Sequence, residues 1–223
     1  MVDTQRLQAA DGREIPGYLN ASAGPGKPAL IVIHEWWGLN AQIRAVADRY
    51  AKEGFNVFAA DLYHGSLATD AQSAEKLMNG LDWGRAMKDI AQAAQALRAK
   101  LGDVKVGITG FCMGGAVTLA AASNLPTAFA AAVPYYGIPP SADLSKIKAK
   151  VQGHFANVDH WCSPDKVNQL EQTLKSANVP AEIHRYEAQH AFANEQRPEV
   201  YSKKDADLAW QRSVEFFRNN LRS

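Results

Sequence analysis

The feature of this chain that most constrains its fold is a cysteine between two glycines, in the segment Gly110-Phe111-Cys112-Met113-Gly114. A run of β-forming residues, 104–109, leads into this segment, and a run of helix-forming residues, 116–122, follows it. A strand, Gly-x-nucleophile-x-Gly and a helix form a nucleophile elbow, here with a thiol where a serine hydroxyl is usual. Glycines suit the elbow because the turn is tight and strained, and larger side chains would clash. The simpler alternative is a small buried cysteine in an ordinary strand–helix turn.

Composition and charge place the chain among ordinary globular proteins, with 47% hydrophobic and 21% charged residues. A net charge of +1 predicts no nucleic-acid partner. The longest apolar runs, 29–33 and 128–133, are too short to span a membrane. Two cysteines without a disulfide framework, and an N-terminus without a long apolar core, favour the cytoplasm. We therefore expect a single cytoplasmic domain over residues 1–223.

Strands and helices are predicted to alternate along the chain. Nearly continuous apolar strands separated by amphipathic helices are typical of a mostly parallel sheet with helices on both faces. Together with the elbow, this alternation predicts an α/β-hydrolase fold, with the ligand site beyond the carboxyl ends of the strands. The predicted strands are 4–7, 14–19, 29–33, 56–60, 104–109, 128–135, 151–157 and 181–186, and the predicted helices are 40–52, 69–79, 83–100, 116–122, 163–177 and 205–221.

A cysteine nucleophile needs a base and a group that orients the base, because a thiol is mostly protonated at neutral pH. In α/β-hydrolases these groups follow the nucleophile in the order acid, then histidine. Asp159 comes directly after the predicted strand 151–157, and His190 follows the strand 181–186. Both therefore fall at carboxyl ends of strands, on the same side as Cys112. The sequence predicts a Cys112-Asp159-His190 triad.

The other acids and histidines have simpler explanations. His154 and His184 lie within strands, where packing or solvent accounts for them. Asp143 and Asp165 lie near helix starts, where capping is expected. His160 is adjacent in sequence to the predicted catalytic aspartate, so the two side chains are expected to diverge.

Glu35 comes two residues after the end of the strand 29–33 and is expected near the thiol, where a carboxylate can take a proton or raise the thiol pKa. From the residues alone, a solvent-facing loop glutamate explains it equally simply. The backbone amides of Trp36 and Met113 are the expected oxyanion-hole donors, because one follows the early strand and the other follows the nucleophile. Trp36 and Trp37 fit either the core or an aromatic wall of the pocket.

Motifs spread from residue 30 to residue 195 resemble the dienelactone hydrolase (carboxymethylenebutenolidase-like) family. The matching stretches are 34–40, 61–63, 107–116, 135–137, Asp159 and 190–192. The resemblance implies a Cys-His-Asp triad at Cys112, His190 and Asp159. It also implies that Glu35 holds the proton of the resting thiol until substrate displaces it, which would protect the sulfur from oxidation.

The chain departs from this family at the residues that hold a substrate carboxylate. Family members that act on a carboxylate-bearing lactone use two arginines, and one of these positions is Asn194 here. The other is absent too, because no arginine occurs between Arg49 and Arg85. Asparagine cannot replace the charge of arginine's planar fork. We therefore predict that dienelactone itself is not the substrate, and Lys76, Arg85 or Arg197 could supply a substitute charge.

The predicted function is hydrolysis of a small ester or lactone through a thioester intermediate, by a monomer or weak homodimer without a cofactor. Direct substrate contacts are expected from Tyr63, Trp37, Phe192 and Asn194. The alternative is a non-catalytic module that binds a small molecule on a hydrolase scaffold, because a fold does not guarantee its chemistry.

The second cysteine, Cys162, allows two further interpretations. A metal site built from Asp159, His160 and Cys162 would have a spacing that is not a usual zinc pattern, so no metal is expected. Cys162 is more simply a buried or pocket-rim thiol, which could form an inactive disulfide with Cys112 under oxidation.

Overall fold

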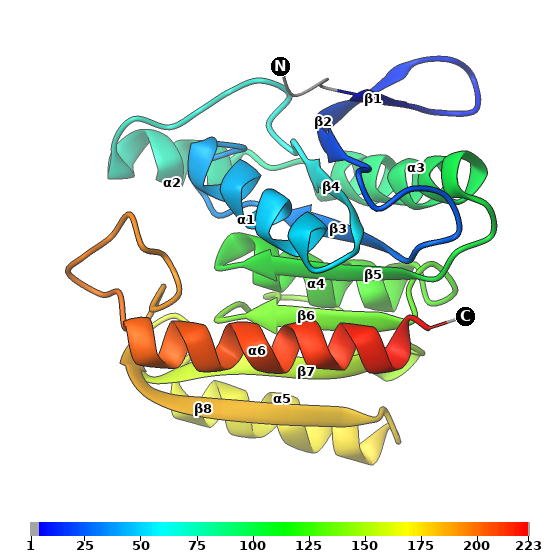
Figure 1. Ribbon diagram of the computed structural model, residues 1–223. Coiled ribbons are helices and arrows are strands. Elements are labelled where there is room, and N and C mark those ends of the chain that lie inside the picture. The colour runs from blue at the N-terminus through cyan, green and yellow to red at the C-terminus, as the bar shows by residue number, and fades with distance from the viewer. Residues whose placement is uncertain (1–4, 223) are drawn as a thin grey trace.

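A computed structural model describes residues 5–222, which fold around a mostly parallel sheet (Figure 1). Within this part of the chain the sheet has eight strands in the order β1-β2-β4-β3-β5-β6-β7-β8. The pairs β1/β2 and β2/β4 are antiparallel, and the remaining pairs are parallel. The strands are β1 Gln5–Gln8, β2 Glu14–Asn20, β3 Ala29–Ile33, β4 Asn56–Ala60, β5 Val106–Phe111, β6 Ala131–Tyr135, β7 Lys150–Val158 and β8 Ala181–Gln189.

Helices cover both faces of the sheet (Figure 1). Helices α1 and α6 pack on one face, in the apolar cluster that contains Ile43 and Phe217. Helices α3, α4 and α5 pack on the other, in the cluster that contains Ile90 and Val167. The predicted parallel sheet between two helical layers is thus confirmed. The helices are α1 Ala41–Lys52, α2 Ala71–Asn79, α3 Trp83–Leu101, α4 Met113–Asn124, α5 Pro164–Ser176, α6 Lys203–Asn220 and a short 3-10 helix, η1 Leu144–Lys146.

Four of the helices begin directly after a side chain that caps them. Asn40, Asp70, Asp82 and Ser163 each accept a hydrogen bond from the backbone N–H three residues later. Each bond satisfies a donor that the first turn of a helix otherwise leaves free. The predicted starts at 40, 69, 83 and 163 therefore agree with α1, α2, α3 and α5 to within two residues.

Several elements differ in length from the prediction, and β7, β8 and α4 are the ones that bear on the site. β7 and β8 both run further, because they pair from Val151 with Ala181 to Val158 with Gln189. The helix α4 begins at residue 113 rather than 116. Residue 4 of the predicted first strand lies outside the described residues. The longer β7 and β8 matter for function, because Asp159 and His190 directly follow their last paired residues.

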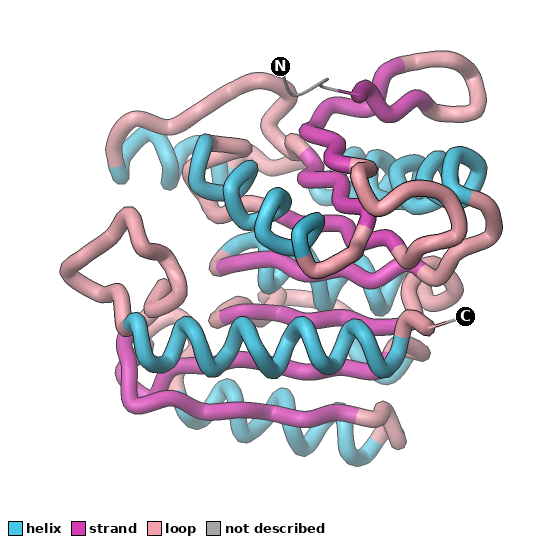
Figure 2. The backbone as a smooth tube through the Cα atoms, viewed as in Figure 1, coloured by secondary structure: helices cyan, strands magenta, loops and turns pink. Residues whose placement is uncertain are grey.

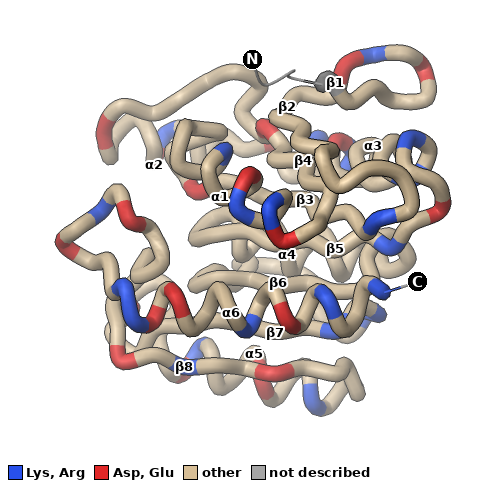
Figure 3. Tube along the Cα trace, viewed as in Figure 1, with Lys and Arg blue, Asp and Glu red and all other residues tan. Residues whose placement is uncertain are grey.

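The carboxyl ends of the parallel strands, marked by arrowheads in Figure 1, meet along one edge of the sheet, where the loops in Figure 2 connect them to the helices. The loop between β8 and α6 projects from this edge. Basic and acidic residues are interspersed over the view in Figure 3, in keeping with the net charge of +1. Within the described residues, the helices are too short or too polar to cross a membrane.

Candidate active site

Cys112 lies in the turn between β5 and α4. Its backbone has φ 55° and ψ −116°, a strained conformation for a residue with a side chain. A Cβ on Gly110 would meet the backbone of Gly114, and a Cβ on Gly114 would lie 2.5 Å from the carbonyl oxygens of Ile33 and His34. The glycines therefore allow β5, α4 and the end of β3 to approach closely, as the elbow motif requires.

His190 contacts both other members of the predicted triad. Its Nε2 lies 3.2 Å from Sγ of Cys112, and its Nδ1 lies 2.7 Å from Oδ2 of Asp159. Because a carboxylate only accepts, Nδ1–H donates to Asp159 and leaves Nε2 free to accept from the thiol. The three side chains come from the ends of β5, β7 and β8 and form one continuous hydrogen-bonded chain.

Asp159 is fixed from its other side by its own loop. Its Oδ1 accepts hydrogen bonds from the backbone N–H of Trp161 at 2.7 Å and of Cys162 at 2.9 Å. Burial raises the pKa of this carboxyl, but the hydrogen bonds from His190 and the two amides outweigh burial and lower the pKa. Asp159 is therefore ionised at neutral pH and can orient the imidazole.

The thiol of Cys112 is held in its neutral form. Burial raises its pKa most, and the nearby charge of Glu35 raises it further. The N–H of Met113 faces the sulfur and acts in the opposite direction, but more weakly. At rest the sulfur therefore carries its proton, and the only described hydrogen-bond partner of Sγ among side chains is His190.

Glu35 is buried beside the thiol, but its described hydrogen bonds go elsewhere. Nδ2 of Asn194 donates to Oε2 at 2.8 Å, and the hydroxyl of Tyr136 lies 3.5 Å from Oε1. Burial raises the pKa of this carboxyl, partly offset by the hydrogen bond from Asn194. In this arrangement Glu35 acts on Cys112 through its charge rather than through a direct hydrogen bond.

The loop after β3 is tied down by His34, which is fully buried. Its Nδ1 lies 2.6 Å from the carbonyl oxygen of Glu35, and its Nε2 accepts from the N–H of Leu62 at 3.2 Å. Leu62 thereby assigns the proton to Nδ1, and burial lowers the imidazole pKa, so the ring is neutral. Among the described residues the N–H of Trp36 has no acceptor, as an oxyanion-hole donor requires.

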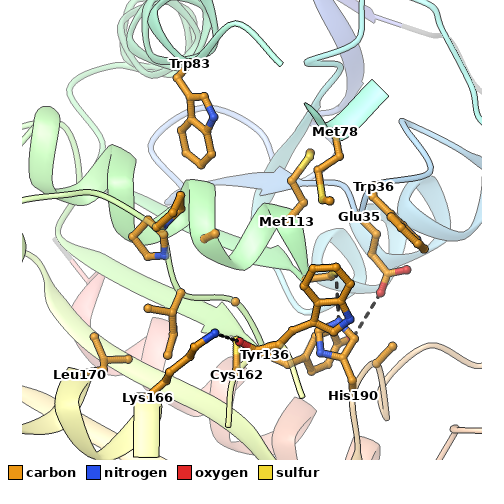
Figure 4. A pocket seen from close by; sticks show the side chains of 18 of the residues that line it. Glu35, Trp36, Met78, Trp83, Met113, Tyr136, Cys162, Lys166, Leu170 and His190 are labelled. Carbon is orange, nitrogen blue, oxygen red and sulfur yellow. Dashed lines mark hydrogen bonds between the residues drawn. The ribbon is translucent and has the colours of Figure 1, made fainter. Parts of the chain in front are cut away.

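Cys112 and His190 open into a cavity of about 670 Å³. Figure 4 shows Glu35 and Trp36 on one side of it, Met113 and Trp83 at its upper wall, and Lys166 and Leu170 on α5 at the other end. This volume is within the range of sites that hold small organic ligands. Cys112, His190 and Glu35 therefore line a cavity large enough for a substrate, and Asp159 lies behind His190, outside the lining.

The four residues predicted to contact substrate lie outside the lining of this cavity. Phe192 is fully buried against the ring of Tyr136, and Asn194 is bonded to Glu35. The hydroxyl of Tyr63 donates to the sulfur of Met113 at 3.1 Å, and the ring of Trp37 packs edge-on against Trp36. In this arrangement each of these four side chains packs behind a residue of the cavity wall and supports it.

The three candidate cations are divided between two cavities. Arg197 lines the cavity of Cys112, where its guanidinium is paired with Glu199 at 2.8 Å. Lys76 and Arg85 line a neighbouring cavity instead. Lys166, on the first turn of α5, is a further cation in the lining that the sequence prediction did not include.

Cys162 is buried, unpaired and part of the same lining as Cys112. Its neighbour His160 is exposed. In the described part of the chain, no group of three or more His, Cys, Asp or Glu side chains is arranged to hold a metal ion.

Several contributors to the site were missed by the sequence prediction. Tyr136 reaches Glu35 from a segment far away along the chain, so no local spacing connects the two. Asn194 is predicted as a substrate contact, and its hydrogen bond to Glu35 is what the prediction lacks. Trp83 and Trp161 were missed as lining residues, although each stands at a loop–helix or strand–loop junction on the carboxyl edge. Their position at these junctions is the sequence signal from which both could be predicted as lining residues.

Comparison with known proteins places the chain in a family. The sequence profile of the dienelactone hydrolase family matches residues 15–221. The chain is 34% identical to protein usf of Aquifex pyrophilus and 33% identical to a candidate carboxymethylenebutenolidase of Aquifex aeolicus, over 95% of this chain and 96% of each relative.

Solved structures give the same result. A candidate dienelactone hydrolase from Klebsiella pneumoniae superposes with a TM-score of 0.84 at 30% identity, over 96% of both chains. A dienelactone hydrolase-like promiscuous phosphotriesterase from metagenomic libraries superposes with a TM-score of 0.85 at 22% identity, over 97% of both chains, and shows the shared fold. The chain therefore has the α/β-hydrolase fold, belongs to the dienelactone hydrolase family and is an ester hydrolase.

Proposed function

We propose that the protein hydrolyses a small ester or lactone, other than dienelactone itself, by a Cys112-His190-Asp159 triad through a thioester intermediate. The observation that carries this proposal is the 3.2 Å contact between Nε2 of His190 and Sγ of Cys112, with Nδ1 bonded to Asp159. A base within hydrogen-bond reach of a nucleophile, itself oriented by a buried acid, is the arrangement that activates a thiol.

The reaction begins with the neutral thiol. His190 takes the proton of Cys112 as the sulfur attacks the ester carbonyl, and the imidazolium is stabilised by ionised Asp159. The N–H groups of Trp36 and Met113 stabilise the oxyanion that develops on the carbonyl oxygen. His190 then protonates the leaving alkoxide, which departs and leaves an acyl group on the sulfur.

The second half of the reaction releases the acid. Water loses a proton to His190 as it attacks the thioester. The oxyanion of this second tetrahedral intermediate accepts hydrogen bonds from the same two N–H groups. Its collapse expels the sulfur, which regains the proton from His190. Each turnover therefore returns Cys112 to its thiol form.

Glu35 adds control to this cycle. Its charge raises the thiol pKa, so little thiolate is present before a substrate carbonyl is there to attack. A protonated thiol is a poor target for oxidants. Both cysteines are free, which suits the reducing cytoplasm as the location of the protein.

The test is hydrolysis of an aryl acetate by single variants. Cys112→Ala and His190→Ala are expected to lose at least about a thousandfold in kcat, as removal of a triad member does elsewhere. Cys162→Ala, which removes the neighbouring thiol, serves as the matched control and is expected to keep its activity. Full activity of Cys112→Ala would overturn the proposal.

A further inference from the structure

Three of the five tryptophans in the chain line the cavity of Cys112. Trp36 follows β3, Trp83 begins α3 and Trp161 follows β7, so three separate segments supply the indole rings. None of the three is buried, and Trp161 is 61% exposed. Leaving large aromatic surface in contact with water costs free energy, so such a wall indicates a surface that a ligand covers.

The rest of the cavity is also largely apolar. Met78, Ile138 and Leu144 belong to its lining. Figure 4 shows the ring of Trp83 at the top of the view and His190 near the bottom, with the side chain of Met113 at a level between them. A volume of about 670 Å³ is larger than a small ester group alone requires. The space beyond the thiol therefore suits a flat apolar substituent of the substrate.

The charges of the lining do not favour an anionic substrate. Arg197 is already paired with Glu199 through both Nε and a terminal nitrogen. Lys166 donates to the carbonyl oxygen of Trp161 at 3.0 Å and is exposed to water, which weakens its attraction for a ligand. Glu35 is the one carboxyl group in the described lining, and when ionised it repels a substrate anion.

We propose that the substrate is an uncharged ester or lactone that carries an aromatic or similarly flat ring, and that this ring packs among Trp36, Trp83 and Trp161. This inference rests on the proposed function and names its substrate class. The indole rings bind the ring of the substrate by stacking and edge contacts, while Cys112 and His190 act on the ester group. Binding of the ring positions the carbonyl at the thiol.

The test compares three esters in a Trp83→Ala/Trp161→Ala double variant. Naphthyl acetate carries a ring on the alcohol side, vinyl naphthoate carries it on the acyl side, and vinyl acetate carries none. We expect kcat/KM to fall about tenfold, mainly through KM, for at least one ring-bearing ester, while vinyl acetate changes little. A Trp83→Phe/Trp161→Phe variant is expected to restore most of the loss, because phenyl rings still stack.

Leu67→Ala is the matched control, because Leu67 is 54% exposed but lines the neighbouring cavity. An equal fall for all three esters, or no fall for either ring-bearing ester, would overturn the inference. Its failure is distinct from failure of the proposed function, which would appear as undiminished hydrolysis of all three esters by Cys112→Ala.

The charge of the substrate is tested with a matched pair. One is the acetate ester of a phenol with a propanoate side chain, and the other is the methyl ester of that propanoate. The side chain insulates the leaving group, so the two differ mainly in charge. We expect a severalfold higher kcat/KM for the methyl ester. A higher kcat/KM for the ester with the free propanoate would contradict an uncharged substrate. If that preference disappeared in Lys166→Gln, Lys166 would be the cation responsible.

Discussion

At the scale of single residues, the hydrogen bonds of His34 determine the direction of the peptide between Glu35 and Trp36. Nδ1–H of His34 holds the carbonyl oxygen of Glu35 at 2.6 Å. In a trans peptide the C=O and N–H point in opposite directions, so this bond turns the N–H of Trp36 away from His34. His34 is therefore a positioning residue for the proposed oxyanion hole, although it touches no substrate.

Replacing His34 by Phe keeps a ring in the buried site but removes both hydrogen bonds. We expect kcat to fall by about ten- to a hundredfold with KM little changed, because the peptide of Trp36 loses its fixed direction. Alkylation of Cys112 by iodoacetamide develops no oxyanion and is expected to keep its rate. A parallel fall in alkylation would show that His34 supports the thiol rather than the oxyanion hole.

The charge of Glu35 makes a separate prediction about the thiol. Glu35 raises the pKa of Cys112, so Glu35→Gln is expected to lower that pKa and increase the thiolate fraction at any given pH. The pH profile of iodoacetamide alkylation measures this, and its midpoint is expected to move to lower pH. Glu195→Gln, at an exposed neighbour of Asn194, is the control that leaves the midpoint in place. An unchanged midpoint in Glu35→Gln would show that burial alone sets the thiol pKa.

The residues of the predicted triad could be found from sequence because each directly follows a strand of one parallel sheet. Strand order then brings Cys112, Asp159 and His190 to a single edge. The pairing of Glu35 with Asn194 and Tyr136 could not be found in this way, because it depends on how three loops pack. The role of Glu35 in holding the thiol proton directly stays a prediction.

At the scale of elements, the start of α4 depends on close packing that helix propensity does not reveal. Glycines disfavour helix, so the sequence predicted a start at residue 116, yet α4 begins at Met113. Gly114 and Gly115 allow its first turn to contact the backbone of neighbouring strands, including the carbonyl oxygens of Ile33 and His34. Tertiary packing therefore overrides local propensity at the elbow.

The same position in two helices tests this packing. Gly114 and Gly84 are each the second residue of a helix, α4 and α3. A Cβ on Gly114 would clash with two backbone carbonyls, whereas one on Gly84 would lie 3.4 Å from the carboxylate of Asp82. We expect Gly114→Ala to lower the free energy of unfolding by about 2–4 kcal/mol and Gly84→Ala to change it by less than about 1 kcal/mol.

Urea denaturation measures both changes in the free energy of unfolding. Equal effects of the two substitutions would contradict the close approach of α4 to β3.

The remaining element boundaries were predictable where caps and apolar runs mark them. The extension of β8 to Gln189 was not, because its outer residues are largely polar and only pairing with β7 keeps them in a strand.

At the scale of the whole molecule, we propose a monomer or weak homodimer. The exposed large hydrophobic side chains among the described residues are Leu67, Val158, Trp161 and Leu208. Trp161 belongs to the lining of the Cys112 cavity, and single exposed apolar residues such as Leu67 and Leu208 are normal on monomers. Basic and acidic residues are interspersed in Figure 3. Sedimentation velocity is expected to give the mass of one chain at low concentration. A dimer that persists on dilution would contradict this prediction.

Cys112 is proposed to carry the acyl group during turnover, and trapping that group on the protein tests the proposal. Wild-type protein is mixed with an aryl acetate, quenched with acid during the steady state, digested and analysed by mass spectrometry. Because an aryl leaving group departs readily, breakdown of the thioester is expected to be the slow step. We expect one acetyl group on the peptide that contains Cys112. Sustained turnover with no acyl group on that peptide, or with the group on another residue, would contradict the proposed mechanism.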